Sequence, residues 1–266
     1  MGMATLNLCS ASAMRFSLAN DGLPSWSGEV LAIGLFKDQQ APELESRWPG
    51  LTNALSRDQF SGKAGQQLVL NLLDSSGPQR LVVLGLGDAA GFNLDGVRSA
   101  AAKAAKAAGG CSGQLGLQLN WEGLEPTAAA AAAAEAVRLA LYADQRFRKS
   151  AEPKVNPEAL ELIGLPPQAA AGFECVNADC AGVELARELV AAPPNVVTPA
   201  ALAQTASEIA ETYGLELSVL ERADCEARGM GAFLAVSQGS DLEPKLIHLV
   251  YRPQGDVKRR LALVGK

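Results

Sequence analysis

The feature that most constrains the fold is a regular alternation of apolar, strand-like segments with helix-like segments over the first 165 residues. The apolar segments are rich in Val, Ile and Leu, which is typical of buried strands. They cover residues 3–10, 13–18, 29–36, 66–73, 80–86, 111–119 and 155–165. Strands that alternate with helices favour a parallel or mostly parallel sheet with helices on its faces. We therefore predict an α/β fold.

The segments between and directly after these strands have helical composition and recognisable ends. They cover residues 42–55, 96–108, 127–149 and 169–191. Asp95 is the predicted N-cap of the second segment, and two glycines from Gly109 end it. The third is rich in alanine, with little to break it. The fourth ends at Pro193, because proline cannot continue the helical hydrogen bonds.

The helix predicted over 169–191 shows an amphipathic pattern. Its apolar positions recur at helical spacing and predict the buried face, whereas its charged residues are expected on the opposite, solvated face. The apolar positions are Val183, Leu185, Ala186, Leu189 and Val190, and the charged ones are Glu184, Arg187 and Glu188.

The segment after Pro194 has the pattern of a second α/β domain that has only begun. Thr198 is the predicted N-cap of a helix that ends at Gly214. A strand over 215–220 and a short helix over 221–228 should follow. Two apolar runs, 246–251 and 260–264, predict neighbouring strands joined by a turn. About 70 residues are fewer than a domain usually has, so we expect an N-terminal portion of a longer protein.

Charge and composition argue against several classes of protein. A net charge of −6 argues against a general nucleic-acid surface, which needs clustered Lys and Arg. The sequence contains no apolar stretch of the ~18 residues that a membrane span requires, and no secretion signal pattern. Five scattered cysteines, an odd number, fit reduced thiols in a cytoplasmic protein. Cys175 and Cys180 are spaced to lie on different helix faces, which argues against a metal pair.

His248 is the only histidine, and it lies inside an apolar strand-like run. With no second histidine, the chain has no other imidazole that could act as the base of a Ser/His/Asp or Cys/His catalytic arrangement. No metal-ligating partner lies near it in the sequence. A packed or edge histidine is the favoured interpretation.

Three weaker patterns suggest phosphate or nucleic-acid binding. Residues 85–90 fit a loose G-x-G-x-x-A motif after a strand, but no acidic residue follows about 20 positions later. A tight turn is the favoured role. Residues 61–65 lack the spacing of a phosphate loop. Lys103 and Lys106, with Arg98 nearby, favour a solvated helix face over a nucleic-acid patch.

Four segments, in order, resemble the leucyl aminopeptidase (cytosol aminopeptidase) family. They are Glu188–Val190 with Pro193–Pro199, then Gly229–Ser240, Pro244–Ile247 and Leu263–Lys266. In the first of them, an alanine stands where the family has an asparagine before the two prolines. The resemblance is specific over roughly residues 180 to 266 and weaker over the first 160.

The resemblance implies a domain organisation. Residues 1–166 are expected to form a macro-like α/β domain, and 167–192 a linker helix. Residues 193–266 are then the incomplete start of an α/β zinc-peptidase-like catalytic domain. A macro-like fold is not by itself evidence that the domain binds nucleotides.

The resemblance also implies an activity. The family members are metalloexopeptidases that release N-terminal amino acids, preferentially leucine, from peptides by two-metal hydrolysis. The metals are Mn²⁺ or Zn²⁺, with bicarbonate as a further participant, and the enzymes are cytoplasmic homo-hexamers. The lysine after Val264-Gly265 matches a family metal ligand, so Lys266 is the predicted metal ligand. The remaining ligands and the catalytic lysine and arginine match no position in these 266 residues, so this chain alone is predicted to be inactive.

A second hypothesis belongs to a different class. The chain would be a non-catalytic module that serves assembly or ligand binding through its N-terminal α/β domain. A peptidase assay on leucine-amide substrates with manganese or zinc separates the two hypotheses.

Overall fold

The computed structural model describes residues 13–19, 22–23, 26–72, 77–149 and 155–265. The remaining residues include the predicted strand 3–10, which therefore lies outside the described residues. Contacts divide the chain into two compact units that meet in the sequence at Arg187 and Glu188.

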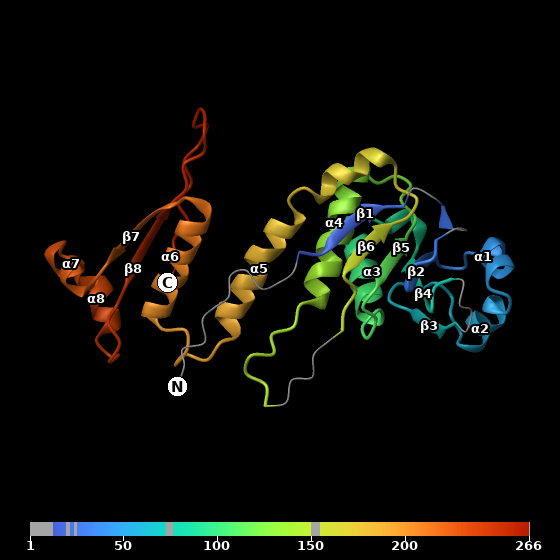
Figure 1. Ribbon diagram of the computed structural model, residues 1–266, viewed down its shortest axis with the longest axis horizontal. Helices are drawn as coiled ribbons and strands as arrows, with labels where there is room; N and C mark the ends of the chain where they lie inside the picture. The colour runs from blue at the N-terminus through green and yellow to red at the C-terminus, as the bar shows by residue number, and fades with distance from the viewer. Residues whose placement is uncertain (1–12, 20–21, 24–25, 73–76, 150–154, 266) are drawn as a thin grey trace. The chain divides into compact units, whose positions relative to one another are not determined.

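The larger unit is built on a six-stranded sheet in the order β1-β6-β5-β2-β4-β3 (Figure 1). Its strands are β1 (Arg15–Leu18), β2 (Val30–Phe36), β3 (Gln67–Asn71), β4 (Arg80–Gly87), β5 (Gln114–Gln118) and β6 (Ala159–Leu162). All neighbours are parallel except β3, which pairs antiparallel with β4 at one edge. The predicted mostly parallel α/β sheet is confirmed.

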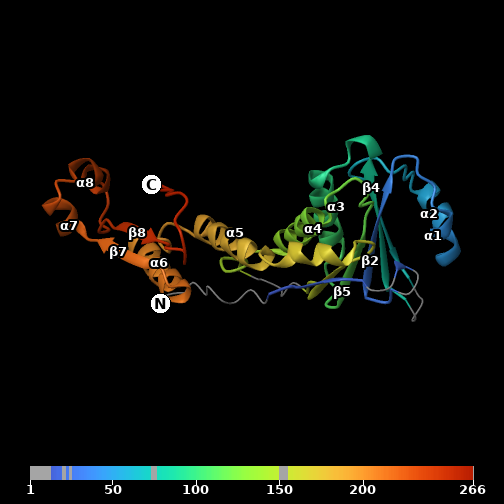
Figure 2. The same ribbon diagram turned by 90° about the horizontal axis from the view of Figure 1, so that it is seen from above.

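Helices cover both faces of this sheet, as Figure 2 shows. On one face lie α1 (Pro42–Arg47) and α2 (Leu51–Arg57), whose Leu44 and Leu51 pack against β2 and β4. On the other lie α3 (Leu94–Ala107) and α4 (Pro126–Leu141). These two helices meet mainly through buried alanines, which allow a close approach. The core is therefore two aliphatic layers separated by the sheet.

The helix predicted to begin after Asp95 begins two residues earlier than expected. Asn93 is the N-cap, and its side-chain oxygen accepts hydrogen bonds from the backbone N–H groups of Asp95 and Gly96 at 3.0 and 3.2 Å. The assignment of Asp95 as cap was wrong because Asn and Asp are comparably good caps two residues apart.

The helix predicted over 127–149 ends at Leu141, so its last eight predicted residues are not helical. Tyr142 turns the backbone into an extended conformation. The carboxylate of Asp144 then accepts from the backbone N–H of Arg146 and pairs with the Arg146 guanidinium at 2.8 Å. Such local side-chain bonding competes with the helix and explains the early end.

The helix predicted over 169–191 is interrupted. It consists of the 3-10 segment η3 (Pro167–Phe173) followed by α5 (Val176–Ala191). Gly172 approaches α4 so closely that a Cβ atom there would lie 2.2 Å from the carbonyl oxygen of Thr127. Tertiary packing on α4 therefore shapes η3.

The smaller unit contains α6 (Pro199–Tyr213), β7 (Glu216–Leu220), α7 (Arg222–Ala227), α8 (Gly231–Ser237) and β8 (Leu246–Val250). The side chain of Thr198 caps α6, and Gly214 ends it at a φ of +67°, as predicted. β7 and β8 pair antiparallel.

The strand predicted over 260–264 is wrong. In the described part of the chain, residues 251–265 form no helix or strand, and Val264 is 96% exposed. The expected neighbour of this segment, β8, pairs with β7 instead. An apolar run becomes a strand only when a sheet edge supplies its hydrogen bonds.

Candidate functional site

The predicted metal ligand, Lys266, lies outside the described residues. Within the described ranges, no group of three or more His, Cys, Asp or Glu side chains is arranged to hold a metal ion. These residues therefore do not by themselves fit a metal centre.

Among the described residues, neither His248 nor the two cysteines Cys175 and Cys180 belong to a cluster of potential metal ligands. His248 lies in β8 opposite Ser218 at an exposed position, in keeping with an edge histidine. Cys175 is exposed and precedes α5, whereas Cys180 is buried within α5, so the two cysteines do not share one helix, contrary to the prediction. Burial raises the pKa of Cys180 to about 11, so it is a protonated thiol at neutral pH.

The glycine-rich patterns serve close packing of the backbone. A Cβ atom on Gly85 would lie 2.1 Å from the carbonyl oxygen of Lys63, and one on Gly62 would lie 2.2 Å from that of Phe36. Gly87, at the end of β4, has a φ of +80°. These residues allow the 61–65 loop to lie against the strand ends, which confirms the tight-turn interpretation.

A cavity of about 530 Å³ beside these glycines has two lysines in its lining. Lys37 pairs with Asp88 at 3.6 Å. The backbone N–H groups that open α3 already donate to Asn93. Lys103, on α3, donates to the carbonyl oxygen of Gly65 at 2.8 Å. This arrangement does not favour phosphate or nucleic-acid binding, because Lys37 and the first backbone N–H groups of α3 already have partners.

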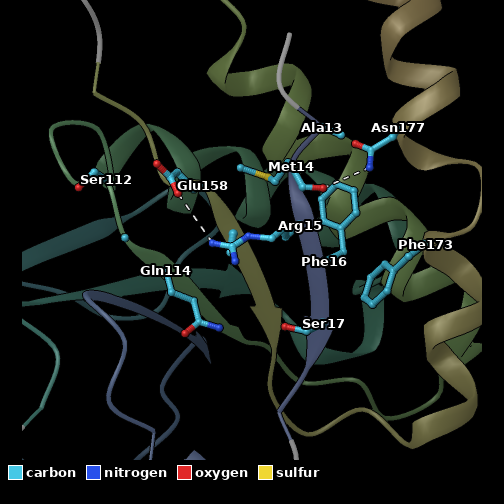
Figure 3. Close-up of a pocket in the computed structure, with 12 residues that line it drawn as sticks. Ala13, Met14, Arg15, Phe16, Ser17, Ser112, Gln114, Glu158, Phe173 and Asn177 are labelled. Carbon is cyan, nitrogen blue, oxygen red and sulfur yellow. Dashed lines mark hydrogen bonds and ion pairs between the residues drawn. The ribbon is translucent and has the colours of Figure 1, made fainter.

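A second cavity, of about 840 Å³, lies at the amino ends of β1, β5 and β6 (Figure 3). Arg15 and Glu158 face each other across it with 3.8 Å between Nη2 and Oε2. The rings of Phe16 and Phe173 stack at 5.6 Å along one side. Both charged side chains are largely exposed and offset each other. The location is opposite to the carboxyl edge, where sites of open α/β sheets are built.

A third cavity, of about 170 Å³, lies at the carboxyl ends of β2 and β5. The buried Ile33 and Leu44 are in its lining, beside the polar side chain of Gln118. The amide oxygen of Gln118 is buried and has no hydrogen-bond partner among the described residues. This is the edge of the sheet where ligands bind in open α/β folds.

One buried ion pair was not predicted from the sequence. Arg138 on α4 and Glu184 on α5 are each only 7% exposed, and Nη2 lies 2.8 Å from Oε2. The hydrogen bonds that Arg138 donates to Glu184 raise the pKa of Arg138. Asn177 accepts from the same guanidinium and donates to the backbone of Met14 at 3.2 Å. The network joins α4, α5 and the start of β1, and is structural.

The predicted faces of the last long helix were therefore wrong. The buried residues of α5 are Val176, Cys180 and Glu184, at a spacing of four, whereas Val183 is 40% exposed. The signal that could have shown this lies on α4, where Arg138 follows the buried Ala130 and Ala134 at the same spacing. An arginine on a buried helix stripe needs a carboxylate partner.

Comparison with known proteins identifies two family matches in order along the chain. The profile described as "Cytosol aminopeptidase family, N-terminal domain" matches residues 32–151, and the one described as "Cytosol aminopeptidase family, catalytic domain" matches residues 184–266. A probable cytosol aminopeptidase of Parasynechococcus marenigrum strain WH8102 is 74% identical over 253 residues, 95% of this chain and 52% of that protein. One from Synechococcus strain CC9902 is 64% identical over 256 residues, with the same shares covered.

Solved structures agree with these sequence matches. A mutant tomato leucine aminopeptidase is similar with a TM-score of 0.85 and 30% identity, covering 94% of this chain and 53% of that one. The bottromycin maturation enzyme BotP, solved in complex with Mn, is similar with a TM-score of 0.66 and 28% identity, covering 85% and 46%. The chain spans about half the length of the curated relatives that it matches.

Proposed function

Because this chain belongs to the cytosol aminopeptidase family, we propose that the whole protein is an aminopeptidase that releases N-terminal amino acids, preferentially leucine, from peptides. The observation that carries the proposal is the match of both family domains, in order, to residues 32–151 and 184–266. The fold supports it, because the similarity to tomato leucine aminopeptidase extends over 94% of the chain.

Catalysis is proposed to depend on two divalent metal ions, Mn²⁺ or Zn²⁺, with bicarbonate as a possible base. A pair of metal ions supplies a nucleophilic water and polarises the scissile carbonyl. The similarity to BotP, which was solved with Mn, supports metal dependence. The described residues do not by themselves supply such a metal centre.

Lys266 is proposed to be a metal ligand in the whole protein. An amine can donate its lone pair only when neutral, whereas a free lysine has a pKa of about 10.4. Desolvation and neighbouring dications both lower the pKa of a lysine, so a metal site favours the neutral form. Without the acidic ligands that bring the metals, Lys266 should remain a cation.

The assembly and location of the whole protein are also proposals. We propose a cytoplasmic homo-hexamer that acts on peptides and has no role for nucleic acid or membrane. The relatives named cytosol aminopeptidase support the location. Among the described residues, no helix is both long enough and apolar enough to cross a bilayer.

Hydrolysis of leucine amide by the full-length protein and by the 266-residue chain tests the activity, with Mn²⁺ or Zn²⁺ present. We expect turnover by the full-length protein and none by the shorter chain. Turnover by purified 1–266 would contradict the predicted inactivity of this part. A folded full-length protein that is inactive with both metals would overturn the enzyme proposal and favour the non-catalytic module.

The role of Lys266 is tested by Lys266→Gln in the full-length protein. Loss of a residue behind a metal ligand typically costs ten- to a hundredfold, so loss of a ligand itself should reduce kcat/KM by about a hundredfold or more. Bound metal, measured by elemental analysis, should fall as well. Lys258→Gln is the matched control, because Lys258 is an exposed lysine in the same segment. Unchanged metal content in Lys266→Gln would argue against ligation.

A further inference from the structure

The cavity of about 170 Å³ lies at the carboxyl ends of the neighbouring strands β2 and β5. These two strands are followed by helices on opposite faces of the sheet. After β2 the chain passes to α1, which packs on one face of the sheet. After β5 it passes to α4, which packs on the other. Such a switch point opens a crevice at the carboxyl ends of the two strands, where open α/β sheets bind ligands.

The cavity has one apolar side and one polar side. Leu23, Ile33, Leu35 and Leu44 supply aliphatic surface. Gln39, Glu43, Gln118 and Asn120 supply the polar groups. Its volume is comparable with the engineered cavity of about 150 Å³ that binds benzene, so it suits a ligand with a body of about six heavy atoms.

The polar side contains one buried acceptor that has no partner among the described residues. Gln118 lies next to Ile33 across the β2–β5 pairing, and its buried amide oxygen has no partner among the described residues. An unpaired buried acceptor is costly, so its environment should contain a donor. The carboxylate of Glu43, on α1, is a second acceptor in the lining and is exposed to solvent. Gln39 and Asn120 already accept hydrogen bonds from the backbone N–H groups of Phe36 and Glu122, so the acceptors left for a ligand are Gln118 and Glu43.

We propose that this cavity binds a small aliphatic compound with a protonated amino group. The branched or straight aliphatic body lies against the leucines, and the ammonium donates to Gln118 and faces the carboxylate of Glu43. A free aliphatic amino acid and a simple alkylamine share this chemistry. The site belongs to the unit that lacks Lys266, so it is independent of the proposed aminopeptidase centre.

Binding can be measured on the 266-residue chain by saturation-transfer NMR and by ¹H–¹⁵N titration with three probes. The probes are 3-methylbutylamine, leucine, and 4-methylpentanoate, which has the aliphatic body without the amine. We expect 3-methylbutylamine to bind and 4-methylpentanoate not to bind. Leucine binding as tightly as the amine identifies the amino-acid source, whereas binding of the amine alone identifies the alkylamine source. Equal binding of all three probes, or of none, overturns the proposal.

Two substitutions assign the binding to the cavity. Gln118→Leu keeps the approximate size of the side chain and removes the acceptor, so affinity for 3-methylbutylamine should fall about tenfold or more. The variant should unfold at the same or a higher urea concentration, because the orphaned acceptor is gone. Glu43→Gln, at the exposed position, should weaken binding about two- to fivefold.

Glu174→Gln is the matched control, since Glu174 is exposed in the same unit and does not line the cavity. It changes the net charge equally and should leave affinity unchanged. If Gln118→Leu proves unstable, Glu43→Gln against Glu174→Gln still decides the question. Unchanged affinity in both cavity variants would overturn the proposal.

Discussion

The guanidinium of Arg138 binds the carboxylate of Glu184 through two hydrogen bonds, Nε to Oε1 at 3.1 Å and Nη2 to Oε2 at 2.8 Å. This bidentate ion pair is buried between α4 and α5. The backbone carbonyl of Asn177 accepts a further hydrogen bond from Nη1 of Arg138 at 2.9 Å. A bidentate pair fixes both the spacing and the rotation of the two helices. It therefore determines which face of α5 is buried.

Removing one partner of this pair should strongly destabilise the larger unit. In Glu184→Gln the Arg138 charge stays buried without a full counter-charge, which typically costs about 3–5 kcal/mol. Urea unfolding at pH 7 measures the loss. Glu174→Gln makes the same charge change at an exposed site of the larger unit and should alter stability by no more than about 0.5 kcal/mol. Equal effects of the two changes would contradict a structural role for the pair.

Removing both partners should cost much less than removing one. Replacing a buried ion pair with apolar side chains of similar volume is often neutral or stabilising. We expect the double variant Arg138→Met with Glu184→Leu to recover about 2 kcal/mol or more relative to Glu184→Gln. Urea unfolding of Arg138→Met, of Glu184→Leu and of the double variant completes the double-mutant cycle. Simple additivity of the single losses would show that the two residues do not act as a pair.

Two glycines ten positions apart in the sequence, Gly172 and Gly182, should respond oppositely to alanine. At Gly172 a Cβ atom would overlap the Thr127 carbonyl, so Gly172→Ala should destabilise by about 1–3 kcal/mol. At Gly182, within α5, a Cβ atom meets nothing within 4 Å. Gly182→Ala should stabilise by up to about 1 kcal/mol, because alanine favours the helix. Thermal unfolding of both variants checks the contrast, and a shared sign would refute it.

Local patterns predicted the strands and the α6 caps because burial and caps are local signals. Thr198 and Gly214 are good examples, since each is favoured by its own side chain or lack of one. The end of α4 depends instead on Asp144 bonding to Arg146, which competes with a strongly helical composition. The strand predicted at 260–264 failed because pairing requires a partner edge that periodicity cannot supply.

The candidate sites were harder to predict because they depend on residues far apart in the sequence. Gln118 and Glu43 come together only through the strand order and the placement of α1. Arg138 and Glu184 are 46 positions apart, and the helical pattern of α5 alone favoured the opposite face. The resemblance to the family assigned Lys266 as a metal ligand. Lys266 lies outside the described residues, so that assignment remains a prediction.

The N-cap of α4 should make stability depend on pH. Backbone N–H groups of Thr127 and Ala128 donate to the carboxylate of Glu125 and lower its pKa. Since the folded pKa lies below the unfolded value of about 4.3, the stabilisation is complete above that value and is lost as pH falls through the folded pKa. Glu125→Gln should therefore lower the urea midpoint at pH 7 and have a progressively smaller effect towards pH 3.

The control for this pH dependence is Glu122→Gln, because Glu122 is exposed in the same loop and does not cap the helix. Its effect on the urea midpoint should be small at every pH. A loss in Glu125→Gln that stays constant between pH 7 and pH 3 would contradict the capping role.

The two neighbouring cysteines should differ widely in reactivity. Cys175 is exposed, whereas Cys180 is buried and burial raises its pKa to about 11. The thiolate is the reactive form, and at pH 8 a thiol with that pKa is roughly 0.1% ionised. Iodoacetamide labelling followed by peptide mass mapping should modify Cys175 quickly in the native protein. Cys180 should be modified only in urea, where it regains an ordinary pKa. Equal native rates at the two positions would show that α5 does not stay packed on α4, and would also contradict the burial of Glu184 one turn further along the helix.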